Sequence, residues 1–156
     1  NLDFIEQVAS RGKLVVVSTG MCSWGDIDKV VEILNSRSCS FILMHTVSTY
    51  PAKEEHLNLR LIQEISERYG AVVGYSAHEA SLTPSIVAAA LGAKVIERHF
   101  TLDRSMWGTD QSASVEPLGL KQLSGSLKKI PFVLGDGIRR AIPGEEEIAR
   151  KLRYWL

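Results

Sequence analysis

The chain has 156 residues, 45% of them hydrophobic and 23% charged, which are the length and composition of one folded domain and exclude a disordered or fibrous protein. Its 18 basic and 18 acidic side chains cancel, so no basic excess points to a nucleic acid or an anionic membrane as partner. No apolar run approaches the ~20 residues of a membrane span and the first residues do not resemble a signal peptide, so with only Cys22 and Cys39 as thiols we expect a reduced, cytoplasmic protein.

Four short apolar runs predict β-strands, and helical patterns separate them. Each run is nearly continuous in its hydrophobicity, as in a parallel sheet that is covered on both faces. The runs are KLVVVST (13–19), SFILMHT (40–46), AVVGYSAH (71–78) and AKVIERHF (93–100). Strict alternation of strands and helices predicts an α/β fold with right-handed crossovers and a parallel sheet.

Local signals place the helices between these strands. Ser23, followed three residues later by Asp26, predicts the start of the first of them. A second helix carries apolar residues from Leu59 onward and is predicted to stop at Gly70, because glycine accepts a positive φ. A third is predicted to begin after Thr83 and to end at Gly92, and a fourth to run from about Pro117 to Lys129, before Pro131.

A last helix is predicted after Pro143. It starts with the acidic run 145–147 and ends with basic residues between 150 and 153, which complement the helix dipole in the favourable sense. Trp155 and Leu156 then leave apolar residues at the terminus, and we interpret the chain as truncated there.

Polar side chains collect at the carboxyl ends of the predicted strands. This is the edge at which parallel α/β folds build their active sites, and the amino ends carry no comparable groups. The residues concerned are Ser18 and Thr19, His45 to Tyr50, Ser76 and His78, and Glu97 and His99. We therefore expect a functional site at this edge.

His78 and His99 are candidate ligands of a divalent metal. Side chains alternate along a strand, so Ser76 shares a face with His78 and Glu97 shares one with His99, and adjacent parallel strands would bring the two imidazoles side by side. Two imidazoles make half of a metal site, with water or substrate oxygens completing it. The alternative is two structural histidines near a loop, and spacing alone leaves both interpretations open.

Other polar groups also have two interpretations. Glu97 could orient a ligand and exchange protons, or form a structural ion pair with a neighbouring base. VSTGM (17–21) suits an oxyanion but is also ordinary turn chemistry. Ser48 and Tyr50 could belong to a substrate loop or a turn, and Asp110 could bind a sugar hydroxyl or cap its own backbone.

Two further histidines are assigned structural or solvent roles. His45 is predicted to be a packed strand residue, because it lies within an apolar strand. His56 has charged neighbours and is predicted to be solvated.

Taken together, these motifs resemble those of the sialic-acid synthase family, the N-acetylneuraminate-type synthases. The resemblance covers almost the whole chain, in the family's order and spacing. It rests on VVVSTGM, HTVSTYPA, LNLRLI, VVGYSAHE, ALGAKVIERHFTLDR, MWGTDQSASVEP and LGDGIRR. It implies a (β/α)8 TIM barrel followed by a small antifreeze-like domain, with residues 1–141 forming strands five to eight, the C-terminal half of the barrel, and residues 142–156 a linker helix to the missing antifreeze-like domain.

The resemblance also implies a reaction. Members of the family are transferases of carbohydrate biosynthesis that condense phosphoenolpyruvate with an N-acylmannosamine-type sugar, release phosphate and form a nine-carbon, sialic-acid-like 2-keto acid. They use a divalent metal, which we expect to be Mn²⁺, with Mg²⁺ or Co²⁺ as alternatives, to polarise the sugar aldehyde. The full-length form is expected to be a homodimer in which the antifreeze-like domain reaches over a partner's active site.

The family's site residues transfer by motif. The metal ligands match His78 of GYSAH and His99 of ERHF, which with Glu97 are the expected catalytic residues. Positions that hold phosphoenolpyruvate match Ser18, Ser48 and Ser76, and positions that line the sugar pocket match Tyr50, Glu97 and Asp110. Ala77 and GTDQ (108–111) depart from the Asp and Gly-Pro-Asp-His that are common in relatives, which bears on the choice of sugar.

Two other functions are weighed against this one. A lysine-dependent aldolase needs a lysine at a strand's carboxyl end, whereas Lys13 and Lys94 lie at the opposite ends. A metal- or sugar-binding interaction module would keep the pocket without the chemistry. Because the family's first four strands, which carry lysines and a glutamate for the substrates, are missing, we expect the chain alone to be inactive, and its two exposed sheet edges to favour homodimerisation or aggregation.

Overall fold

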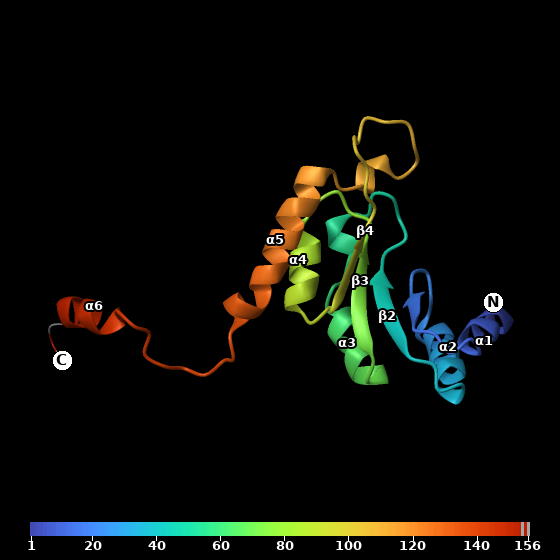
Figure 1. Ribbon diagram of the computed structural model, residues 1–156, viewed down its shortest axis with the longest axis horizontal. Helices are drawn as coiled ribbons and strands as arrows, with labels where there is room; N and C mark the ends of the chain where they lie inside the picture. The colour runs from blue at the N-terminus through green and yellow to red at the C-terminus, as the bar shows by residue number, and fades with distance from the viewer. Residues whose placement is uncertain (154, 156) are drawn as a thin grey trace.

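The computed structural model describes residues 1–153 and 155, and the predicted alternation of strands and helices is confirmed there (Figure 1). The interpretation of the apolar end of the chain rests in part on Leu156, which lies outside the described residues. In chain order the elements are α1 (Leu2–Ala9), β1 (Val15–Ser18), α2 (Trp24–Ser36), β2 (Phe41–Thr46), the 3₁₀ helix η1 (Glu54–His56), α3 (Leu61–Tyr69), β3 (Val72–Ala77), α4 (Thr83–Ala90), β4 (Val95–Arg98), the 3₁₀ helix η2 (Gln111–Ala113), α5 (Pro117–Leu134) and α6 (Glu145–Leu152).

The strands form one parallel sheet in the order β1-β2-β3-β4. The sheet therefore follows the chain, as expected when each strand is joined to the next by a helical crossover. The register pairs Thr46 with Ser76 and Ser76 with Glu97. Paired residues of neighbouring strands point to the same face, so this register aligns polar side chains at the carboxyl end of the sheet.

The hydrophobic core lies between the helices and one face of the sheet. Leu43 of β2 and Tyr75 of β3 are completely buried in it. The helices contribute apolar side chains at helical spacing, namely Ile27 and Val31 of α2, Ile62 and Ile65 of α3, and Ala88 of α4. Burial of this face is the main force that holds the helices on the sheet.

The other face of the sheet is partly open, which corrects the expectation of a sheet covered on both faces. The side chains of Val16 and Val72 on this face are 51% and 48% exposed. The nearly continuous hydrophobicity of the strands predicts two covered faces, because both faces carry valine and isoleucine, but within the described residues the helix-packed core lies on one face only.

Two predicted helix boundaries are confirmed by their hydrogen bonds. Ser23 and Asp26 form a capping box, in which the Asp26 amide donates to Ser23 Oγ at 3.3 Å and the Ser23 amide donates to Asp26 Oδ2 at 2.9 Å. These bonds hold the pKa of Asp26 below its usual value, chiefly through the Ser23 hydroxyl. Gly70 ends α3 with φ of 58°, and its amide donates to Ser66 O.

Two predicted boundaries are wrong. α5 continues through Pro131 to Leu134, whereas the sequence predicts an end near Lys129. Proline deprives the helix of only one amide donor. The helical hydrogen bonds resume beyond it, since the Gly135 amide donates to Pro131 O at 3.1 Å. Leu59, expected in the second helix, precedes the first residue of α3 and still packs against the core.

The last helix forms as predicted, with the acidic run at its start and Arg150 and Lys151 in its final turn. Figure 1 shows α6 well away from the sheet, at the end of an extended segment that follows α5. Within the described part of the chain, no helix is both long enough and apolar enough to cross a membrane.

His45 is confirmed as a packed strand residue, and its burial predicts a pH dependence. The Nε2 atom of its ring lies 2.7 Å from the backbone oxygen of Leu57. Burial lowers the pKa of His45 below its ordinary value, and the bond to Leu57 opposes this only in part. The neutral ring is thus favoured in the folded state, so its contribution to stability is present above the unfolded pKa of about 6.5 and is lost as the pH falls toward the lower folded pKa.

We therefore expect the urea midpoint to fall between pH 7.5 and pH 5.5, and to fall less in His45→Gln, which keeps a neutral donor. Asp26 and Asp28, whose pKa values are lowered by hydrogen bonds, remain charged over this range. Equal pH slopes for the two proteins would contradict a role for His45.

Candidate functional site

Three aromatic side chains meet at the carboxyl ends of β2, β3 and β4, and we call Tyr50, His78 and His99 the ring cluster. The ring centroids of His78 and His99 are 5.2 Å apart. Tyr50 lies 4.2 Å from the His78 ring and 5.6 Å from the His99 ring, which it meets at 86°. The predicted pairing of the two histidines is confirmed, since each follows directly after one of two adjacent strands.

His78 is held in a defined orientation by the loop after β2. Its Nδ1 lies 2.9 Å from Val47 O and 3.3 Å from Thr46 Oγ1, and its side chain is buried. The His78 carbonyl accepts from the Ala52 amide at 2.9 Å, which ties the Tyr50 loop to the end of β3. An imidazole whose Nδ1 donates to a backbone carbonyl presents its Nε2 lone pair, which is the usual arrangement of a metal-binding histidine.

His99 is more exposed and lies beside Asp110. Its Nδ1 is 3.9 Å from Asp110 Oδ2, and the two side chains are 36% and 43% exposed. Asp110 precedes η2, and its carboxylate accepts no capping hydrogen bond from a backbone amide of that helix. Of the two interpretations of Asp110, the structure therefore favours a carboxylate that faces the ring cluster over one that caps its own backbone.

Glu97 and Ser76 form a hydrogen-bonded pair on the same face of the sheet as the two histidines. Ser76 Oγ donates to Glu97 Oε1 at 2.7 Å, across paired positions of β3 and β4. Among the described residues Glu97 has no ion-pair partner, which disfavours the structural ion pair considered from the sequence. Its second carboxylate oxygen is left for solvent or a ligand.

Ser18 and Ser48 lie on the β1 side of the site. Ser18 ends β1, two strands away from the strand that carries His78. Ser48 packs against Gly20, where an added Cβ would collide with Ser48 Oγ and with Thr46 Cγ2. Glycine at position 20 thus allows the turn after β1 to approach the loop after β2, and it brings the two serine-bearing segments together.

The donor set fits two positions of a divalent cation. Within the described residues, no group of three or more His, Cys, Asp and Glu side chains is arranged to hold a metal. His78 and His99 offer two imidazole nitrogens, which suit Mn²⁺ and similar ions, so the other ligands of such an ion would come from water, substrate or residues outside this chain.

A buried charge pair behind the ring cluster is not anticipated by the sequence analysis. Arg98 Nη1 lies 2.7 Å from Glu79 Oε1, and these side chains are 3% and 1% exposed. Tyr75 donates its hydroxyl to Glu79 Oε2 at 2.8 Å, and burial, aided by Glu79, raises the pKa of Tyr75 far above its usual value. The sequence does carry one signal for this pair. Side chains alternate along a strand, so Arg98 is a charged residue on the same face as the apolar Ile96.

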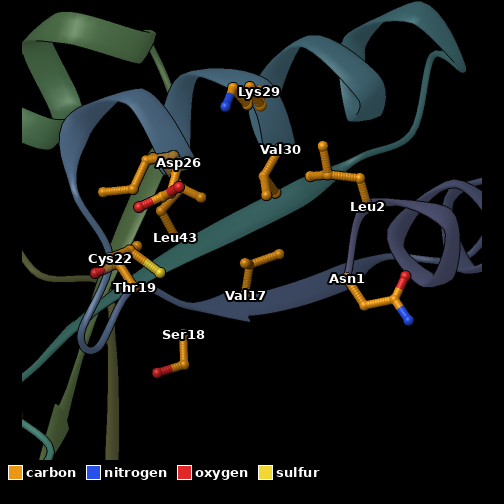
Figure 2. Close-up of a pocket in the computed structure, with 11 residues that line it drawn as sticks. Asn1, Leu2, Val17, Ser18, Thr19, Cys22, Asp26, Lys29, Val30 and Leu43 are labelled. Carbon is orange, nitrogen blue, oxygen red and sulfur yellow. The ribbon is translucent and has the colours of Figure 1, made fainter.

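A separate pocket of about 290 Å³ lies between α1, β1 and α2 (Figure 2). Val17 and Leu43 line it together with residues of α2, and Figure 2 shows Ser18 extending from the opposite side of β1 to Val17. No member of the ring cluster lines this pocket. It is a gap on the helix side of the sheet edge, and of the predicted site residues Ser18 alone is among those that line it.

His56 is confirmed as a solvated residue, with 59% of its side chain exposed. It lies in η1, and its nearest charged partner is Glu55, with 3.8 Å between His56 Nε2 and the carboxylate. His56 therefore belongs to the surface and serves as a reference histidine for experiments on the ring cluster.

Comparison with known proteins places these features in a family. A model of the NeuB family matches residues 1–139. N,N'-diacetyllegionaminic acid synthase of Campylobacter jejuni is 37% identical over 150 residues, which are 94% of this chain and 45% of that protein. N-acetylneuraminate-9-phosphate synthase of Homo sapiens is 37% identical over 153 residues, which are 97% of this chain and 43% of that protein. The chain spans less than half the length of these two relatives.

A solved structure shows the same arrangement of elements. The N-acetylneuraminic acid (sialic acid) synthetase of Leptospira borgpetersenii, in complex with citrate, superposes with a TM-score of 0.86 at 35% identity. The match covers 98% of this chain and 55% of that chain. The predicted α/β half-barrel, with four parallel strands and their helices, is thereby confirmed.

Proposed function

Because the chain belongs to the NeuB family, we propose that it forms one half of an active site that condenses phosphoenolpyruvate with an N-acylmannosamine-type sugar and releases phosphate. In this proposal its strands are the fifth to eighth of a TIM barrel. The observation that carries it is the ring cluster, which sets two imidazoles 5.2 Å apart at the carboxyl edge, where barrel enzymes hold their substrates.

Each residue of the site has a proposed role that its contacts support. His78 and His99 hold the divalent cation, for which we propose Mn²⁺, and a cation there would polarise the sugar aldehyde. Tyr50 and Asp110 border the two rings and line the sugar site. Glu97, oriented by the Ser76 hydroxyl, exchanges a proton with the sugar through its second oxygen.

The serines form the phosphoenolpyruvate side of the proposed site. The Ser18 and Ser48 hydroxyls can donate to the carboxylate or phosphate oxygens of that substrate, and the Ser76 hydroxyl can do so when it gives up its hydrogen bond to Glu97. The three serines come from the ends of three successive strands or the loops that follow them. These serines bring no positive charge, so full counter-charges for phosphoenolpyruvate must come from elsewhere. We therefore expect the 156-residue chain by itself to release no phosphate.

The first test is a titration with Mn²⁺ followed by electron paramagnetic resonance. We expect the folded chain to bind the ion and His78→Ala/His99→Ala to lose at least tenfold in affinity, because both proposed protein ligands are gone. Circular dichroism of both proteins establishes that the variant is folded. His56→Ala is the matched control, since it removes an exposed histidine and should leave the titration unchanged.

Unchanged Mn²⁺ binding in the double variant would contradict the assignment of these ligands. A second function, a metal- or sugar-binding module without catalysis, would use the same ring cluster of Tyr50, His78 and His99. Phosphate release from phosphoenolpyruvate and N-acetylmannosamine separates the two functions. It requires the chain to be combined with the remaining half of a relative's barrel, and its absence there would favour the module.

A further inference from the structure

The buried charge pair is formed by the chain neighbours of the two histidines. Glu79 follows His78 and Arg98 precedes His99. Side chains alternate along a strand, so Arg98 points to the helix side of the sheet while His99 points to the other side. The Glu79–Arg98 contact of 2.7 Å therefore joins, behind the sheet, the two backbone positions from which the imidazoles extend in front.

Arg98 also binds the segments on either side of the ring cluster. Its Nη1 donates to Ser81 O at 2.9 Å and to Ser85 Oγ at 3.2 Å, in the loop after β3 and in α4. Its Nη2 donates to Glu79 O at 2.6 Å and to Ala113 O at 3.3 Å. Ala113 belongs to η2, which begins directly after Asp110. One guanidinium therefore connects the segments that carry His78, His99 and Asp110.

Stability alone does not account for this pair. Removing two charges from water is costly, and well-packed apolar side chains of similar volume often stabilise a fold as well or better. Arg98 Nε has no hydrogen-bond partner within the described chain, so its burial adds a further cost. What a guanidinium offers that an apolar side chain does not is a planar fork that fixes several acceptors in one geometry.

We propose that Glu79 and Arg98 are positioning residues that set the placement of the His78 ring relative to the His99 ring and keep Asp110 beside His99. The pair acts through the backbone and does not touch a ligand. The geometric part of this proposal is independent of the reaction, whereas its consequence for metal binding rests on the proposed function.

The test is the double variant Glu79→Leu/Arg98→Met, which removes both charges and keeps similar volume in the buried site. With isotope-labelled histidine, nuclear magnetic resonance reports cross-relaxation between the ring protons of His78 and His99, which needs no metal. We expect this signal to be lost or strongly weakened in the variant while circular dichroism remains that of a folded protein. Mn²⁺ affinity should fall by about tenfold or more, as for other residues that orient ligands.

Two further variants make the test decisive. Arg98→Lys keeps the charge but not the fork, so the ring signal should also weaken there, and this variant decides the matter if the double variant does not fold. Asp28→Leu/Arg68→Met is the control, because it removes an arginine–carboxylate pair elsewhere, between α2 and α3, and should leave both readouts unchanged.

Unaltered ring cross-relaxation in a folded Glu79→Leu/Arg98→Met variant would overturn the positioning role. If the unmodified chain binds no Mn²⁺, the proposed metal site fails, yet the ring signal still decides whether the pair positions the histidines.

Discussion

Arg98→Ala is expected to lower the free energy of unfolding by about 3–5 kcal/mol, because Glu79 is then a buried carboxylate without its counter-charge. Truncation also leaves the carbonyls of Ser81 and Ala113 without a donor. Urea denaturation followed by circular dichroism measures the change.

Comparison with Glu79→Leu/Arg98→Met separates charge burial from packing. The double variant leaves no unpaired charge, so we expect it to be more stable than Arg98→Ala, although it lacks both members of the pair. A loss below about 1 kcal/mol in Arg98→Ala would mean that water reaches Glu79 and that the pair is not truly buried.

Leu43→Ala is expected to cost about 2–5 kcal/mol, the range found when a fully buried leucine is truncated and its cavity does not collapse. Leu43 lies in the inner strand β2 and is completely buried against the helices. Val16→Ala is the matched control on the opposite face of the sheet, where the side chain is 51% exposed, and it should cost well under 1 kcal/mol.

Urea midpoints of the two variants provide the measurement. A large loss in Val16→Ala would show that the open face is covered in solution, for instance by a second copy of the chain. Light scattering on the same samples would then reveal the association.

The strands and the face of each site residue were predictable because they depend on local pattern. Apolar runs mark the strands, the alternation of side chains along a strand places His78 and His99 on one side, and the order of the strands makes them neighbours. The capping box at Ser23 and the positive φ at Gly70 are equally local, since each involves residues three or four apart.

The features that escaped prediction depend on contacts between distant segments. Arg98 meets Ala113 and Glu79 through the packing of a loop, a strand and a 3₁₀ helix, and no spacing rule encodes that meeting. Asp110 was assigned to the site through the family resemblance, because its approach to His99 also depends on the packing of a loop. Pro131 misled the prediction because its usual effect, the loss of one amide donor, was small compared with the hydrogen bonds that continue beyond it.

The metal, the substrates and the role of each site residue remain predictions. The structure brings Tyr50, His78, His99 and Asp110 together, which the proposed chemistry requires. The same contacts would serve a binding module, and phosphate release distinguishes the two functions.

The position of β4 at the edge of the sheet has a consequence for motion. β3 has a hydrogen-bonded neighbour on each side, whereas β4 is bonded only to β3 within the described chain. Local opening is easier for a segment with fewer backbone hydrogen bonds and fewer contacts. His99 is nevertheless held on its other side, because its carbonyl accepts from the Val115 amide at 2.8 Å, so we expect opening of this edge to leave the His99 end of β4 in place.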